Sequence, residues 1–135
     1  MYNEYLLKFI IFGDIMASVF ITKLVAGFEA KGWIVYTNAP DKDDGKQVVI
    51  QQEAVDIVKE TATSYRYTPT IKMRAVIDND VLDEELKEAI QITETAVTPE
   101  MIDWQIVNID IQPMGTTNYV TISGTYVEIL YVTNV

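Results

Sequence analysis

The last third of the chain carries the clearest structural pattern, and the remaining elements have to pack around it. Residues 105–112 alternate apolar and polar side chains, a period of two that is typical of a half-buried β-strand. Residues 113–118 contain proline, glycine and asparagine, which favour a turn. Residues 119–133 are rich in β-branched and aromatic side chains and predict a second strand. The chain is therefore predicted to end in a long antiparallel hairpin.

A second pair of strands is predicted before it, in residues 47–59 and 65–77. The first is rich in β-branched residues, and in the second apolar side chains alternate with polar ones, among them Lys72 and Arg74. Pro69 indicates that the second strand begins at an edge or a bulge, because proline cannot donate a ladder hydrogen bond. The short segment between the strands favours a turn, so they form another long hairpin.

Helical spacing predicts an amphipathic helix over residues 15–31, which Gly32 ends in a left-handed cap. Asp80 is predicted to cap a second helix over residues 81–92, where acids in the first turn interact favourably with the helix dipole. The predicted buried stripe of the first helix is Val19, Phe20, Leu24, Val25 and Phe28.

Two short elements complete the order: a strand at residues 33–37 and a helix at residues 98–104, which opens with a Thr-Pro-Glu start signal. This order predicts an α+β fold, with a mostly antiparallel sheet built from two long hairpins and helices packed on one face. Residues 16–135 then form a single α+β domain, preceded by an apolar N-terminal arm at residues 1–15.

The arm is not predicted to enter a membrane. Lys8, Asp14 and Lys23 divide the apolar N-terminal region into pieces shorter than the roughly 20 residues that a transmembrane helix needs. Glu4 stands where a signal peptide would carry basic residues. Two roles stay open for the arm: it docks on a neighbouring subunit, or it covers the core of its own chain.

The residue types available for catalysis are restricted, because the chain has no cysteine and no histidine. The commonest general base, the commonest metal ligand and any thiolate chemistry are thereby excluded. No nucleophile elbow or phosphate-binding glycine loop is present. Asp41, Asp43 and Asp44 lie in a polar loop, but their spacing does not match a calcium-binding loop. We expect no enzymatic activity, no cofactor and no metal site.

Charge is distributed unevenly along the chain, whose formal net charge is −10. All ten basic residues lie at or before Lys87, and residues 88–135 contain six acids. A protein that binds the phosphate backbone without sequence selectivity needs the opposite balance. The acidity either serves solubility or forms a surface for a basic partner, or a ring lumen that repels nucleic acid.

The final strand is apolar on both faces. At Gly124 its apolar side chains change phase, so that Val127 and Ile129 have the opposite parity to Val120 and Ile122. A bulge near Gly124 would restore a single apolar face. Otherwise the strand is covered on both sides or shared with another subunit, and we favour a subunit contact.

Ten side chains are predicted to contact a neighbouring subunit. They come from the arm, the second predicted strand pair, the second helix and the final strand: Leu6, Phe9, Ile10, Lys72, Arg74, Asp83, Glu84, Tyr126, Leu130 and Val132. Among them, Lys72 and Arg74 are expected to face the acids Asp83 and Glu84 of the neighbour.

The order of elements resembles that of the tail terminator proteins, which join tail to head in long-tailed bacteriophages. The resemblance is one of pattern rather than of a short motif, and it covers residues 16–135; the arm has no clear counterpart. The segments that carry it are the helix at 16–31, the strands around 48–58 and 65–77, the helix opening at Asp80, and the ending at 119–132.

The resemblance implies a structural virion protein that forms a homo-oligomeric ring, commonly a hexamer, on the tail tube. Such a ring would contact the tail tube protein and the head connector or adaptor proteins, and DNA would pass through it without specific binding. The protein would be made in the host cytoplasm and lie at the tail–neck junction of the virion. Two alternatives stay open: another head–tail joining or tail-tube-like virion protein, and a small acidic inhibitor that mimics DNA.

Overall fold

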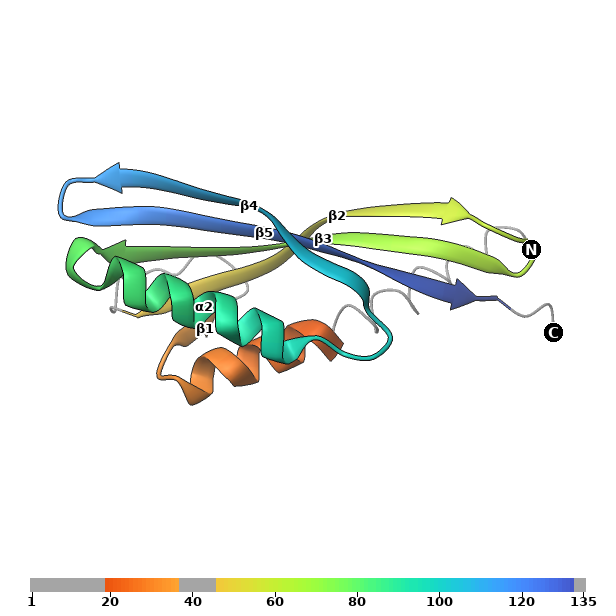
Figure 1. The fold of residues 1–135 in the computed structure, drawn as a ribbon, viewed down its shortest axis with the longest axis horizontal. Helices are drawn as coiled ribbons and strands as arrows, with labels where there is room; N and C mark the ends of the chain where they lie inside the picture. Colours follow the sequence, from red (N-terminus) through yellow and green to blue (C-terminus); the bar gives the residue numbers. More distant parts are fainter. Residues whose placement is uncertain (1–18, 37–45, 133–135) are drawn as a thin grey trace.

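The computed structural model describes residues 19–36 and 46–132 of the chain. They form an α+β fold around a five-stranded, mostly antiparallel sheet with the strand order β1-β2-β3-β5-β4. In Figure 1 the sheet is long and strongly twisted, and two helices run side by side below it. The first helix covers residues 19–30. The other elements are β1 (Ile34–Tyr36), β2 (Gln47–Lys59), β3 (Ser64–Asp78), the 3-10 turn η1 (Asn79–Val81), α2 (Leu82–Ala96), β4 (Ile102–Met114) and β5 (Thr117–Tyr131).

Three of the four strand pairings are antiparallel: β2 with β3, β3 with β5, and β4 with β5. The fourth, between β1 and β2, is parallel and makes the sheet mixed, which the sequence did not reveal. The strand predicted at residues 47–59 is confirmed as β2. The turn between β4 and β5 contains Gly115 at φ +70°, as its turn chemistry predicts.

The main core lies between the two helices and the sheet. Phe20, Leu24 and Phe28 of the first helix are buried against sheet residues that include Ile50 and Met73. The predicted stripe is therefore largely right, but Val19 is wrong, because its side chain is 44% exposed. Successive residues of an α-helix are rotated by about 100° about the helix axis. Val19 directly precedes Phe20, so its side chain points away from the buried stripe.

Gly32 ends the first helix as predicted, at φ +85°. The N–H of Trp33 donates to the carbonyl of Phe28, and the N–H of Gly32 donates to the carbonyl of Glu29, both at 3.0 Å. These two bonds are the Schellman pattern, which satisfies helix carbonyls that would otherwise lack partners.

The predicted start of the second helix is wrong. Asp80 lies inside η1, and α2 begins at Leu82 with no side-chain cap. The contacts of Asn79 explain the difference: its N–H donates to Thr116 at 3.0 Å, and its side-chain oxygen accepts from Asn118 at 2.6 Å. The β4–β5 turn therefore holds this segment in place, and a local capping signal does not include that contact.

The helix predicted at residues 98–104 is also wrong, because a single turn leads directly into β4. The N–H of Met101 donates to the carbonyl of Thr98 at 3.1 Å, and the Met101 side chain is buried. Trp104 then packs on Phe20, with ring centroids 4.9 Å apart. The apolar side chains of this segment reach the core from an extended backbone.

A bulge near Gly124, one of the alternatives for the final strand, is absent from β5, where the buried residues apart from Ser123 keep one parity from Val120 to Leu130. The irregularities lie in the partner strand instead, where the β4 register shifts between Ile102 and Gln105 and again between Ile106 and Asn108. The strand therefore has one core face, and the phase change in its apolar residues does not alter its geometry.

Candidate assembly surfaces

The sheet has two edges that no described strand covers. β4 is the last strand in the sheet order and pairs only with β5. At the opposite side, β1 pairs with β2 only over Gln47–Val49, so residues 52–59 of β2 have no described strand on their outer side. An uncovered edge presents unpaired backbone N–H and C=O groups that can pair with another chain.

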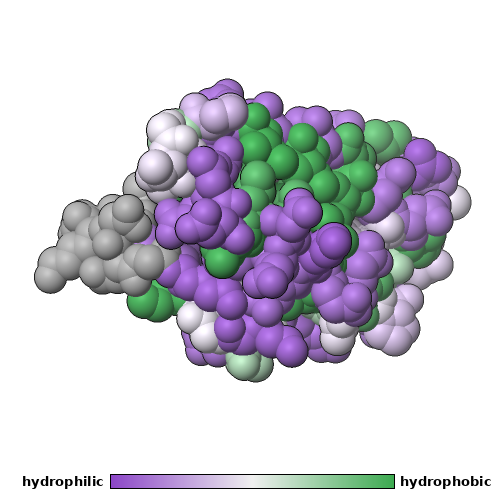
Figure 2. Space-filling view, turned by 60° about the vertical axis from the view of Figure 1, so that its left-hand side comes forward, coloured by the Kyte–Doolittle hydropathy of each residue, from purple (hydrophilic) through white to green (hydrophobic). Residues whose placement is uncertain are grey.

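Both edges are apolar as well as open. Ten large apolar side chains are exposed in the described part of the chain, and six of them lie on β2 or β4. The most exposed of the six is Val107, at 55%. They are Val55, Val58, Ile102, Val107, Ile111 and Met114. Hydrophobic surface that reaches the outside between hydrophilic side chains is visible in Figure 2. Monomeric proteins usually protect such edges with charged side chains.

Part of β4 is nevertheless unsuited to pairing. Its two register shifts lie before Asn108, and Pro113 lacks a backbone donor near its other end. Asp103, beside the first shift, has φ +54°. The regular stretch between these features is residues 108–112, which is the segment best able to accept a neighbouring strand.

Lys72 and Arg74, predicted to face acids of a neighbour, are paired within the chain. Glu53, at the register shift in β2, accepts hydrogen bonds from Arg74 and from Lys72, the latter at 3.0 Å. Arg74 also donates to Gln51 at 2.9 Å. The hydrogen bonds from Arg74 and then Lys72 lower the pKa of the Glu53 carboxyl. The structure thus identifies Glu53 as their partner, which the sequence analysis missed.

Asp83 and Glu84 are exposed in the first turn of α2, and neither forms an ion pair with a described base. The structure does not bring them to Lys72 or Arg74 within one chain. Their contact with a neighbouring subunit stays a prediction. Leu6, Phe9 and Ile10 lie outside the described residues.

Two predicted contact residues need correction. Tyr126 and Leu130 are each only 1% exposed, because both point to the core side of β5. Tyr126 packs edge-on against Phe20 at 5.6 Å, and Leu130 forms a small cluster with Tyr67. Both are therefore covered by their own chain and have no free surface for a neighbour. Val132 is partly buried against the same cluster.

Beside these residues the core side holds polar atoms without hydrogen-bond partners. Glu128 is 3% exposed, and its Oε2 atom has no hydrogen-bond partner among the described residues. The Tyr126 hydroxyl and the Trp104 ring N–H are likewise buried, without a partner in that part of the chain. Burial, with a smaller contribution from Glu100, raises the pKa of Glu128 to about 7. The signal in the sequence is parity, since Glu128 alternates in phase with Tyr126 and Leu130.

No group of three or more acidic, histidine or cysteine side chains that could hold a metal ion occurs in the described ranges. The acidic loop with Asp41, Asp43 and Asp44 lies outside those ranges. None of the helices described is long and apolar enough to cross a membrane.

Fold and surface together define a small α+β protein whose mixed sheet has two open, apolar edges in its described part. A scan of protein-family models and a search of curated proteins found no match to this sequence. Its function therefore has to be argued from these surfaces.

Proposed function

We propose that this protein is a structural subunit that assembles with copies of itself through the edges of its sheet. The supporting observation is that, within the described residues, six of the ten exposed large apolar side chains lie on β4 or β2, the strands that form the two open edges. Pairing these edges would remove apolar area from water, at about 25 cal/mol per Å², and would satisfy open backbone groups. In this proposal β2 with β3 and β4 with β5 form two long hairpins, and the helices cover one face of the sheet.

The two open edges lie on opposite sides of the sheet, so a contact between them is heterologous. β4 of one subunit would pair with the outer side of residues 52–59 in β2 of the next subunit. Such contacts produce a closed ring when the rotation between subunits closes, and an open filament when it does not. A ring leaves no free edge and limits its own size, which favours it for a soluble protein.

A ring of this kind would suit the tail–neck junction of a bacteriophage, where it would act as a tail terminator. The resemblance in element order supports this role, and so does the net charge of −10, which would repel DNA passing through the lumen. The ring would contact the tail tube protein on one side and head connector proteins on the other, without catalysing a reaction. The alternative is another joining or tail-tube-like virion protein.

Purified protein is expected to have the mass of a ring, commonly six subunits, in light scattering, and negative-stain images are expected to show a central hole. Stacking of the particles into long tubes would favour the tail-tube alternative. A monomer at all concentrations and salt conditions would contradict assembly through the edges of the free protein.

The edge contact is tested by the double variant Val107→Lys and Ile111→Lys. Both side chains are exposed on β4, so the fold is expected to persist while the charges block a neighbouring strand. We expect the mass to fall to that of a monomer. The matched control is Val19→Lys, an exposed valine on the first helix, which should assemble normally. Loss of assembly in the control, or intact rings in the double variant, would refute the edge contact.

Reversing Lys72 and Arg74 to Glu is expected to loosen the ring if these cations also reach a neighbour. The reversal breaks their pairing with Glu53 as well, so Glu53→Gln, which disrupts only that internal pairing, is the matched control. Sedimentation velocity of both variants separates the two effects. Equal loosening by Glu53→Gln would assign the effect to the internal cluster, and unchanged rings in the reversal would exclude the contact.

A further inference from the structure

A second surface lies between the first helix and α2, where the two helices leave a groove of about 810 Å³. Its floor is made of small or apolar residues: Ala26, Gly27 and Ala30 from the first helix, with Ile92 and Ala96 from α2. A Cβ atom on Gly27 would lie 2.8 Å from Ile92, so the helices are in close contact here. None of the residues that line the groove belongs to a strand, so this surface is separate from the sheet edges.

The rim of the groove is basic. Of the eight basic residues in the described ranges, four form ion pairs with described acids. Three of the other four, Lys23, Lys31 and Lys87, line this one groove. The chain has a net charge of −10, so this groove is a locally basic surface on an acidic protein.

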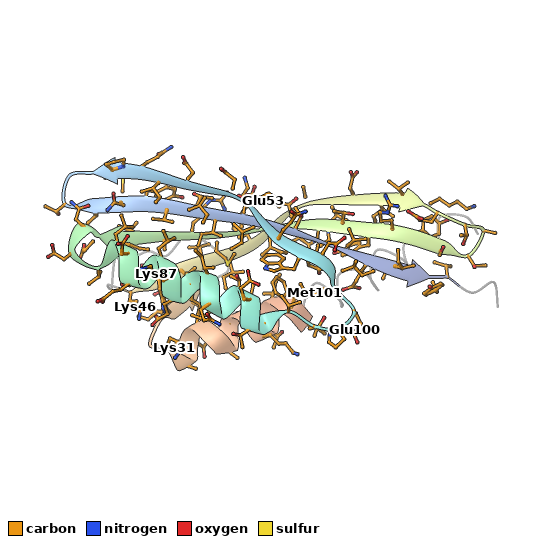
Figure 3. The ribbon with its side chains drawn as sticks, in the orientation of Figure 1. Lys31, Lys46, Glu53, Lys87, Glu100 and Met101 are labelled. Carbon is orange, nitrogen blue, oxygen red and sulfur yellow. The ribbon has the colours of Figure 1, made fainter. Side chains whose placement is uncertain are left out.

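The one acid that lines the groove is already engaged. Glu88 accepts hydrogen bonds from Lys46 at 2.7 Å and from the Trp33 ring N–H at 2.6 Å. The Lys46 bond is the main reason that the pKa of Glu88 is lowered. In Figure 3, Lys31, Lys46 and Lys87 lie near one another on the helical side of the molecule. Glu88 is therefore engaged by Lys46 and Trp33, with a weaker attraction to Lys31, and the groove lining holds no other acid to neutralise Lys23 and Lys87.

We propose that this groove binds an acidic amphipathic helix of a partner protein. Alanine and glycine on the floor allow the backbone of a third helix to approach closely, and its apolar face would cover Ile92 and Ala96. Glutamates or aspartates on the flanks of that helix would meet Lys23, Lys31 and Lys87. An apolar floor suits a row of side chains better than a phosphate backbone, which needs polar contacts along its length.

The probe for this surface is a fluorescein-labelled 20-residue peptide designed as a helix, with Leu and Ala on one face and Glu on its flanks. Fluorescence anisotropy measures its binding to the full chain between low and high salt. We expect binding that weakens as salt rises, because the rim charges are exposed to screening. The same peptide with Lys in place of Glu is expected not to bind.

The double variant Lys23→Glu and Lys87→Glu is expected to weaken peptide binding by about tenfold or more. Ala30→Trp, which fills the exposed floor without changing charge, should weaken it as well. The control is Lys59→Glu, because Lys59 is also exposed and free of ion pairs with described acids but lies on β2, away from the groove. Circular dichroism checks that each variant is folded.

Three results would overturn the proposal. One is the absence of binding by the acidic peptide, or an equal loss in Lys59→Glu, which would indicate general charge attraction. Another is tighter binding of a 20-base-pair DNA duplex, lost in the Lys23 and Lys87 variant, which would assign the groove to a polyanion. The third is a self-association that disappears in that variant alone, which would assign it to a second copy of the chain. These results do not decide ring formation, which the β4 variants test independently.

Discussion

Glu128→Gln is expected to stabilise the folded protein at pH 8 by about 3 kcal/mol. Glu128 is 3% exposed, and its Oε2 atom has no hydrogen-bond partner within residues 19–36 and 46–132. Burial raises the pKa of its carboxyl from 4.5 to about 7. Above pH 7 the wild-type chain must therefore hold an unpaired negative charge in its interior, and the neutral amide removes that cost.

The sign of the pH dependence follows from the two pKa values of Glu128. Well below pH 4.5 the carboxyl is protonated in both the folded and the unfolded chain, so its ionisation does not change stability. Between 4.5 and about 7 the unfolded chain releases the proton while the folded chain retains it, so stability falls as pH rises. Above about 7 the loss is complete and constant. The variant should thus match the wild type at pH 4, exceed it increasingly up to about pH 7, and keep a nearly constant excess at pH 8.

Urea unfolding of both proteins at several pH values between 4 and 8.5 measures this difference directly. Taking the difference between wild type and variant cancels the contributions of other titrating groups. Glu94→Gln is the control, because Glu94 is exposed on α2 and its substitution should change stability little at any pH. A stability gain that is equal at pH 4 and pH 8 would show that folding does not raise the pKa of this carboxyl.

Much of the fold could be predicted because its signals are local. The extent of β2 follows from composition, and Gly32 and Gly115 occupy the positive-φ positions that their surroundings predict. The buried stripe at Phe20, Leu24 and Phe28 follows from helical spacing alone. In each case the physical cause lies within a few residues of its effect.

The misplaced elements depend on contacts between distant segments. Asp80 looks like a helix cap, but Asn79 is held by Thr116 and Asn118 of the β4–β5 turn. Residues 98–104 carry a helix-start signal, but Trp104 reaches Phe20 only from a strand. The parallel pairing of β1 with β2 joins segments on either side of residues 37–46 and has no signature in either strand.

The candidate surfaces were partly accessible from the sequence. An assembly role was inferred from apolar parity in the final strand, yet Tyr126 and Leu130 of that strand are buried in their own chain. The exposed apolar residues lie mainly on β2 and β4, because edge position depends on strand order and not on composition. The lysine-rimmed groove could not be predicted, since Lys23 and Lys87 come together only when the two helices pack.

Gly124→Ala is expected to destabilise the protein by about 2–3 kcal/mol, although it adds one methyl group to a β-strand. A Cβ atom at this position would lie 2.1 Å from Cη2 of Trp104 and 2.7 Å from Cζ2. The indole cannot withdraw easily, because it packs against Phe20 at 4.9 Å and near Tyr126 at 6.4 Å. Gly124 is therefore required for space, since the Trp104 ring lies directly over its backbone.

A double-mutant cycle with Trp104→Phe tests this explanation. The smaller ring should leave room for the methyl group, so Gly124→Ala should cost much less in the Trp104→Phe background than in the wild type. Gly115→Ala is the control, because Gly115 has φ +70° with no atom within 4 Å of the added Cβ. Its cost should be backbone strain and should not depend on Trp104. If both alanine substitutions cost the same in both backgrounds, the effect at Gly124 comes from its own backbone, and the contact with Trp104 does not determine the glycine.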